Sequence, residues 1–169
     1  QAVQKFSDND LCVFQGKTFT YKSIGTCVNK VAEGLQKMGA KKGVKVGLFL
    51  PNTPYSLMFY YGILKTGATV VNYNPLYVEH ELTNQIEDSE TDIMVTLDLA
   101  ILYDKMRGLL KETRLKKVIV AKFTDLLPFP KGCLFRIAKG GDIAVIDRSD
   151  KIIWFHDLID NDGQIQKID

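Results

Sequence analysis

The sequence predicts an α/β fold: an open, mostly parallel sheet with helices on both faces and a less regular C-terminal part. Between residues 21 and 121, helical patterns alternate with short apolar runs at least four times, which favours right-handed strand–helix–strand units. The run at 44–50 is apolar except at Lys45 and Gly47 and lacks the alternation of a half-exposed strand. That pattern is typical of a parallel strand buried on both faces.

Residues 1–20 are expected to form a β-hairpin that leads into the domain. The strand-like segments 11–14 and 17–20 flank a turn at Gln15 and Gly16, as in a hairpin with a two-residue loop. From residue 21 to 38 apolar side chains recur in steps of three and four, which predicts an amphipathic helix. Gly39 supplies the C-terminal stop of that helix.

The middle of the chain predicts a tight strand–helix–strand crossover. After the strand at 44–50, Thr53 is suited to cap a helix, and Pro54 stands at the first helical position, where a missing N–H costs nothing. The helix is apolar nearly all round and ends at Gly67, and residues 68–71 form the next strand.

Helices at 78–87 and 99–111 and strands at 92–96 and 117–121 complete an α/β core that we place at 21–121. Prolines and glycines then break the pattern, so residues 122–169 are expected to be an irregular, linking segment. Within it the sequence predicts late strands at 143–146 and 152–155, or a hairpin around 148–150, and a helical turn at 155–159.

Bulk composition indicates an ordinary globular protein. The chain has 169 residues, of which 46% are hydrophobic, and a net charge of +2, so nothing favours nucleic acid as a partner. Cys12, Cys27 and Cys133 are widely spaced, which favours free thiols in a reducing compartment. No apolar run approaches the roughly 20 residues of a membrane span, and we see no leader at Gln1. We expect a cytoplasmic protein whose two ends are cuts through a longer chain.

Several short motifs follow one another along the chain. They are Gly16-Lys17-Thr18-Phe19-Thr20-Tyr21, Val31-Ala32-Glu33-Gly34-Leu35, Gly43-Val44-Lys45-Val46, Leu50-Pro51-Asn52, Leu64-Lys65-Thr66-Gly67-Ala68, Asn74-Pro75-Leu76-Tyr77, Glu81-Leu82 and Asp88-Ser89. In these motifs and their order, over roughly residues 10–125, the chain resembles the N-terminal region of the adenylate-forming acyl-CoA synthetases, and most closely the bacterial long-chain fatty-acid–CoA ligases. Val44 and Lys45 depart from the family's usual Asp-Arg pair.

The resemblance implies an acid–thiol ligase that uses ATP, Mg²⁺ and coenzyme A to form an acyl adenylate and then an acyl-CoA thioester. The family's Ser/Thr/Gly-rich phosphate loop and its later adenylate-binding motifs are not found in this sequence. The diglycine in Lys139-Gly140-Gly141-Asp142 has no strand before it and no helix after it, so we interpret it as a plain turn. We therefore assign no catalytic, cofactor-binding or metal-binding residue, and we expect the fragment alone to be inactive.

Other candidate residues are better explained by structure than by chemistry. His80 is expected on a solvated helix face and His156 in partial packing. The basic groups Lys41, Lys42 and Lys45, and Arg114, Lys116 and Lys117, stand before strands and are expected to form a solvated rim opposite the ligand edge of the sheet. Phe59, Tyr60 and Tyr61 are expected to pack in the core or between domains.

The carboxyl ends of the strands are the expected place for a binding role. Asn52 and Thr53 follow one strand and residues 73–77 follow another, so these loops are candidates for the wall of a substrate channel. The apolar, proline-broken segment 126–137 has two interpretations: a packed connection, which we favour, or a patch that dips into a membrane or admits substrate.

Partners implied by the resemblance are a fatty acid, ATP and coenzyme A, with a second copy of the chain and peripheral contact with the inner face of the membrane as further candidates. Two alternatives stay open for the function: a ligase for aryl or medium-chain acids, and a free-standing, non-catalytic α/β binding module. A dinucleotide-binding domain is excluded because no Gly-x-Gly-x-x-Gly turn joins a strand to a helix.

Overall fold

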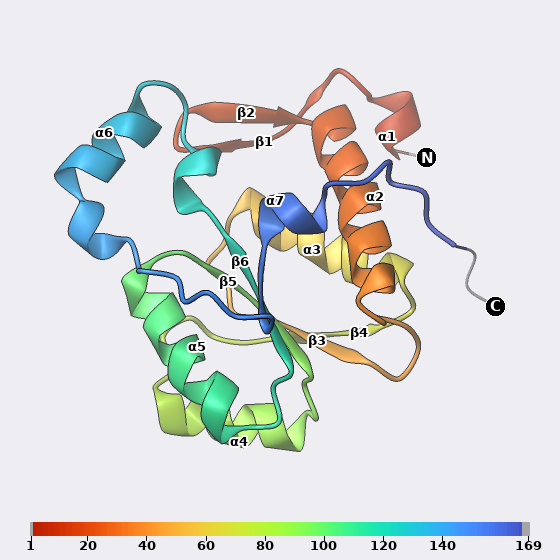
Figure 1. Ribbon diagram of the computed structural model, residues 1–169. Coiled ribbons are helices and arrows are strands. Elements are labelled where there is room, and N and C mark those ends of the chain that lie inside the picture. Colours follow the sequence, from red (N-terminus) through yellow and green to blue (C-terminus); the bar gives the residue numbers. More distant parts are fainter. Residues whose placement is uncertain (1, 167–169) are drawn as a thin grey trace.

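A computed structural model describes residues 2–166 of the chain (Figure 1). Its central feature is a five-stranded sheet in the order β4-β3-β5-β6-β7, in which every neighbouring pair is parallel. A separate two-stranded antiparallel hairpin precedes the sheet. The N-terminal half contains α1 (Ala2–Lys5), β1 (Asp10–Phe14), β2 (Lys17–Thr20), α2 (Tyr21–Lys37), β3 (Lys45–Leu48), α3 (Pro54–Lys65) and β4 (Thr69–Asn72). The rest contains α4 (Glu79–Asp88), β5 (Ile93–Leu97), α5 (Ala100–Glu112), β6 (Lys117–Ala121), η1 (Phe123–Leu126), α6 (Lys131–Ala138), η2 (Gly140–Asp142), β7 (Ile152–Trp154) and α7 (Phe155–Leu158).

Local sequence signals fix the hairpin and the first long helix. Gln15 and Gly16 both have positive φ angles, 53° and 90°, as a two-residue turn between twisted strands requires. Thr20 caps α2 by accepting a hydrogen bond from the Ser23 N–H at 3.2 Å. Gly39, with φ of 91°, ends the helix in the left-handed conformation that glycine adopts without strain.

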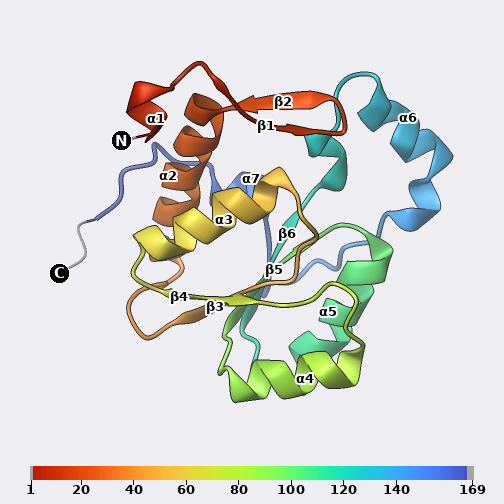
Figure 2. The same cartoon turned by 180° about the vertical axis from the view of Figure 1, so that it is seen from behind.

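Helices cover both faces of the sheet (Figure 2). The helices α2, α3 and α7 lie on one face and α4 and α5 on the other. Helices α2 and α3 pack closely because α3 has a glycine at the contact: a Cβ at Gly62 would lie 2.5 Å from Val31 Cγ1. The predicted fold class, an open parallel sheet with helices on both faces, is confirmed.

The core lies between the sheet and these helices, and the strands are its most buried part. All five side chains of β5 are buried, as expected of a central parallel strand. In β3, Gly47 leaves room for its neighbours, since a Cβ there would lie 2.5 Å from Met94 Sδ and 2.7 Å from Tyr73 Cε2. The glycine that interrupts the apolar run of β3 therefore lets the Tyr73 ring cross the sheet.

The C-terminal part differs from the sequence-based expectation in three places. Residues 131–138 form a helix, α6, which was not predicted. Residues 143–146 were predicted to be a strand, but there only Ile143 forms an isolated bridge, with Leu99. The hairpin around 148–150 is wrong as well, because β7 pairs in parallel with β6 and extends the main sheet. The late strand at 152–155 and the helical turn at 155–159 are confirmed as β7 and α7.

Within the described residues, no helix combines the length and the apolar character that a membrane span requires.

Candidate functional site at the carboxyl edge of the sheet

The strand order places the reversal of winding between β3 and β5. The chain passes from β3 outward to β4, then returns across β3 to β5 and continues outward through β6 and β7. In open α/β sheets, ligands bind outside the carboxyl ends of the strands at such a reversal. In this chain, Phe49 follows β3 and Asp98 follows β5, and the Phe49 N–H donates to the Val95 carbonyl at 3.0 Å. These two residues therefore define the candidate site.

Asp98 is a buried carboxylate at this edge, only 5% exposed. One of its oxygens accepts a hydrogen bond from the Phe123 N–H at 2.7 Å, and its backbone carbonyl accepts one from the Ala144 N–H at 2.8 Å. Burial raises the pKa of the carboxyl group, while the Phe123 hydrogen bond opposes that rise. Asp98 thus ties the chain after β6 to the end of β5. Sequence reasoning missed this residue, although a carboxylate directly after a buried strand was a usable signal.

Lys105 covers the other side of the reversal point. Its Nζ lies 5.8 Å from the centre of the Phe49 ring and donates to the Tyr77 carbonyl at 2.7 Å. Lys105 belongs to α5, and Tyr77 closes a turn after β4, with its N–H bonded to the Asn74 carbonyl at 3.0 Å. The lysine therefore bridges two loops above the buried aromatic ring, and its ammonium group is engaged within the protein.

The beginning of α3 borders a pocket of about 320 Å³ at the same edge. Ser56 organises this turn: its hydroxyl donates to the Pro51 carbonyl at 2.9 Å, and its N–H donates to the Thr53 carbonyl at 2.9 Å. The wall is largely apolar. It is formed by the hairpin strand β1 and the first turn of α3, namely Cys12, Val13, Phe14, Asn52, Thr53, Pro54, Ser56 and Leu57.

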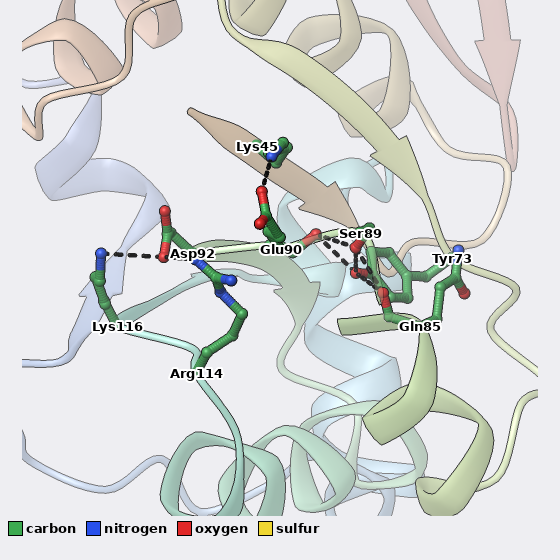
Figure 3. A network of polar contacts seen from close by, with 9 residues as sticks. Lys45, Tyr73, Gln85, Ser89, Glu90, Asp92, Arg114 and Lys116 are labelled. Atoms are coloured by element: carbon green, nitrogen blue, oxygen red, sulfur yellow. Dashed lines mark hydrogen bonds and ion pairs between the residues drawn. The ribbon is translucent and has the colours of Figure 1, made fainter. Parts of the chain in front are cut away.

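The predicted channel-wall residues do not all face a ligand. Asn52 and Thr53 line the pocket, but Tyr73 is 3% exposed and its side chain turns away from the edge. Its hydroxyl lies 2.7 Å from Thr91 Oγ1 and 2.9 Å from Ser89 Oγ, before β5 (Figure 3). Tyr73 therefore stabilises the packing of α4 and β5 instead of facing a ligand.

Tyr55 connects the first turn of α3 to the segment after β6. Its hydroxyl donates to the Lys122 carbonyl at 3.2 Å, and its ring packs edge-on against Phe155 with 4.7 Å between the ring centres. Burial raises the pKa of this phenol, and the charge of Asp125 adds to the rise. Tyr55 is therefore a neutral hydrogen-bond donor that fixes two elements of this edge.

The edge does not fit the triphosphate that the resemblance implies. A helix N-terminus binds phosphate through free backbone N–H groups, but α3 begins with Pro54, which has none, and the Ser56 N–H is already bonded. The other helix at the reversal, α5, follows the buried carboxylate of Asp98, which repels an anion. Residues 2–166 also contain no cluster of His, Cys, Asp or Glu that could hold a metal ion.

The diglycine forms a plain turn, as predicted. Gly140 begins a single 3₁₀ turn directly after α6, and both Gly140 and Gly141 are exposed. Lys139 Nζ lies 4.0 Å from an oxygen of Asp142 across this turn. The preceding strand and following helix that would make a phosphate cradle are replaced by α6 and by an extended segment.

Both histidines lie on the surface. His80 is exposed on α4, where its Nε2 lies 3.3 Å from Asn84 Nδ2, which agrees with the predicted solvated face. His156 stacks on Trp154, with 6.0 Å between the ring centres, and its Nε2 lies 3.3 Å from Asp157. The prediction that His156 is partly packed holds for its ring, which stacks on Trp154. The residue as a whole is exposed.

The two basic groups lie at the amino ends of the strands and are partly neutralised there (Figure 3). Lys45 pairs with Glu90. Asp92 lies 3.3 Å from Arg114 and 3.1 Å from Lys116. The structure therefore supports the predicted rim over a nucleotide-binding patch, with ion pairs that the sequence did not predict.

The three consecutive aromatic residues of α3, Phe59, Tyr60 and Tyr61, separate into two kinds. Phe59 is fully buried and lies 5.6 Å from the Phe155 ring, so it belongs to the core. Tyr60 and Tyr61 are 40% and 54% exposed. The core prediction thus holds for Phe59, and the two tyrosines face outward.

Solved structures of acid ligases share this arrangement. The structure of a long-chain-fatty-acid-CoA ligase from Archaeoglobus fulgidus superimposes with a TM-score of 0.64 at 28% identity, covering 70% of this chain and 25% of that chain. A coronafacic acid ligase from Pectobacterium brasiliense gives a TM-score of 0.78 at 17% identity, covering 99% of this chain and 29% of that one. The latter likeness shows the fold alone.

Sequence comparison leads to the same group of proteins. The long-chain-fatty-acid–CoA ligase of Bacillus subtilis strain 168 is 37% identical over 138 residues, which are 82% of this chain and 24% of that protein. The chain thus spans about a quarter of the length of the curated relatives it matches. The family model described as "AMP-binding enzyme" matches residues 1–146, and the chain therefore belongs to the family of AMP-binding enzymes.

Proposed function

We propose that this chain is the N-terminal portion of an AMP-forming acid–thiol ligase that acts on long-chain fatty acids. In that reaction a carboxylate displaces pyrophosphate from ATP to give an acyl adenylate, and the thiol of coenzyme A then displaces AMP to give the thioester. The observation that carries the proposal is the 37% identity with the long-chain enzyme of Bacillus subtilis over most of this chain.

The part played by the described residues is that of a scaffold. Residues 1–20 and 21–121 would supply the hairpin and most of the α/β unit. Residues 122–169 would add β7 and α7 to that unit and lead toward the catalytic core. The carboxyl edge of the sheet is occupied by internal contacts of Asp98, Lys105 and Ser56. ATP, Mg²⁺ and coenzyme A would therefore be held by residues outside the described ones, and no catalytic step is assigned to this chain.

The test compares the full-length protein with the 169-residue chain. We expect the full-length protein to release pyrophosphate when ATP, Mg²⁺, coenzyme A and palmitate are all present, and the shorter chain to release none. A substrate panel of palmitate, octanoate and 4-coumarate distinguishes the acids. Preference for octanoate or coumarate would replace the long-chain proposal, and no activity with any acid in the full-length protein would favour the free-standing binding module.

We further propose that the protein is located in the cytoplasm, because ATP and coenzyme A are supplied there. We also propose that it contacts a second copy of itself or a membrane surface. All three cysteines are free thiols, which agrees with a reducing compartment. Burial raises the pKa of Cys27 to about 11, so this thiol stays protonated and unreactive at neutral pH. Tyr60, Tyr61 and Leu64 on α3 are exposed and support contact with a second copy.

A further inference from the structure

The two edges of the main sheet differ in charge. The connections that leave the strands, residues 49–53, 73–78, 98–99 and 122, contain two charged residues, Asp98 and Lys122. Both are engaged within the protein, since Asp98 is buried and Lys122 Nζ lies 5.5 Å from the centre of the Trp154 ring. The connections that lead into the strands are residues 38–44, 66–68, 89–92, 113–116 and 143–151, and their charged residues are Lys41, Lys42, Glu90, Asp92, Arg114, Lys116, Asp147, Arg148, Asp150 and Lys151.

Large apolar side chains are exposed at the carboxyl edge instead of charges. This apolar rim consists of Val13 in the hairpin, Leu76 and Val78 after β4, Ile101 at the start of α5 and Phe129 after η1. Leu76 is 83% exposed and Ile101 72%. In the connections that lead into the strands, the described residues expose a large apolar side chain only at Val145. Even that residue lies toward the carboxyl edge, because its neighbour Ala144 donates to the Asp98 carbonyl.

The lysines near the apolar rim are already bonded. Lys17 and Lys131 donate to backbone carbonyl groups at 2.6 Å and 3.1 Å, as Lys105 does at 2.7 Å. An anionic lipid or a nucleic acid therefore finds little free positive charge at this edge. A surface that combines exposed apolar side chains with few charges is typical of the core of a protein–protein or domain–domain interface.

The length of the relatives indicates what covers the apolar rim. The chain covers 24% of the ligase of Bacillus subtilis and 25% of the chain from Archaeoglobus fulgidus, so under the proposed function about three quarters of the ligase lie outside it. Open α/β sheets bind ligands at the carboxyl edge, but the edge described here does not fit a triphosphate. The groups that hold ATP must therefore approach this edge from the remainder of the chain.

We propose that the apolar rim is the docking surface for the remainder of the ligase, the part of the chain that follows these residues. The charged amino edge stays in contact with solvent. This inference rests on the proposed function, because it requires that the chain belongs to a longer ligase.

Thiol labelling of the full-length protein tests the proposal. Leu76→Cys and Ile101→Cys place a thiol on the apolar rim, and Lys42→Cys and Ser149→Cys place one at exposed positions of the amino edge. Each labelling rate is measured by peptide mass spectrometry and divided by the rate of the same variant in urea. We expect the ratio to be at least ~tenfold lower at the rim than at the amino edge. Equal ratios at the two edges would show that the rim is open to solvent and would overturn the proposal.

Photochemical crosslinking identifies what covers the rim. Benzoylphenylalanine replaces Leu76 or Ile101 in the full-length protein, with replacement of Lys42 as the control. We expect the two rim positions to give a product of monomer mass in which the label is joined to a peptide beyond residue 169, and the control to give none. A product of dimer mass would assign the rim to a second copy, and crosslinks confined to residues 1–169 would leave the rim without a partner. Either result would contradict the docking of the remainder.

The outcome is distinguishable from that of the ligase assay, because neither experiment contains ATP, coenzyme A or a fatty acid. An unprotected rim in an active ligase would remove this inference and leave the proposed function standing. A protected rim in a full-length protein that activates no acid would remove the proposed function and leave the docking surface standing.

Discussion

At the scale of single residues, the contacts that shape the carboxyl edge join positions far apart in the chain. Asp98 holds the Phe123 N–H, 25 residues away, and Lys105 holds the Tyr77 carbonyl, 28 residues away. The sequence pattern predicted the strands that precede Asp98 and Tyr77, because an apolar run is a local property. It could not predict the hydrogen-bond partners, because these depend on which loops the sheet brings together.

Replacement of Asp98 should separate its hydrogen bond from its charge. In Asp98→Ala the Phe123 N–H loses its acceptor, and we expect the free energy of unfolding to fall by about 1–3 kcal/mol. Asp98→Asn keeps an oxygen acceptor, so its free energy of unfolding should fall by less. Urea unfolding followed by circular dichroism measures both values. A loss for Asn as large as that for Ala would contradict the role given to the hydrogen bond.

The same carboxylate predicts a pH dependence. Because the pKa of Asp98 is raised in the folded chain, the folded state binds this proton more tightly than the unfolded state does. Its contribution to stability is therefore full below the ordinary carboxyl pKa of about 4 and is lost as the pH rises through the raised pKa. As the pH rises over that range, the free energy of unfolding of the wild type should fall relative to that of Asp98→Asn. Parallel pH profiles for the two proteins would refute this.

For helices and strands, the segments with a strong apolar period were predicted correctly. Prolines and glycines, which usually interrupt helices, led to a wrong prediction. The helix predicted at 21–38 is α2, which the structure places at Tyr21–Lys37, and the strand at 117–121 is β6, Lys117–Ala121. Helix α6 was missed because Pro128, Pro130 and Gly132 interrupt the apolar pattern. Pro130 stands just before the first turn of α6, where proline is tolerated. The predicted hairpin partner of β7 was wrong, and β7 pairs with β6 instead. An apolar run of three residues does not specify which strand it joins.

Two glycines in helix interiors provide a matched test of packing between elements. A Cβ at Gly34 in α2 would lie 2.2 Å from the Leu158 carbonyl oxygen of α7, whereas a Cβ at Gly108 in α5 meets nothing within 4 Å. Gly34→Ala should therefore lower the free energy of unfolding by about 1–3 kcal/mol. Gly108→Ala should raise it by about 0.5–1 kcal/mol. Thermal and urea unfolding of both variants measure the difference, and equal effects would rule out a close α2–α7 contact.

At the scale of the whole molecule, the sheet is one unit that includes residues beyond the end of the family match. That match ends at residue 146, but β7 and α7 follow it. Phe155 of α7 is 9% exposed and packs on Tyr55 and Phe59 of α3. Residues 147–158 therefore complete the core, which the weak periodicity after residue 122 did not reveal.

Truncation at residue 146 should for this reason be severe. Loss of Phe155 alone removes a buried aromatic side chain, at a cost of about 3–5 kcal/mol, and β6 loses its neighbour strand. We expect this shorter chain to lack a cooperative unfolding transition, whereas a chain that ends at residue 163 and keeps β7 and α7 should retain one. Differential scanning calorimetry decides between them. A cooperative transition in the 146-residue form would show that β7 and α7 are dispensable.

The segment that follows α7 lies against α2, and this order of contacts matters during synthesis of the chain. Asn161 Nδ2 donates to the Lys30 carbonyl at 3.1 Å, and the Gln164 N–H donates to Glu33 at 2.6 Å, so the last described residues return along the first long helix. On the ribosome, α2 is made some 130 residues before these partners emerge. Until then part of its surface has no native cover. The carbonyl of Lys30 and the carboxylate of Glu33 therefore meet their native partners only after translation has passed residue 164.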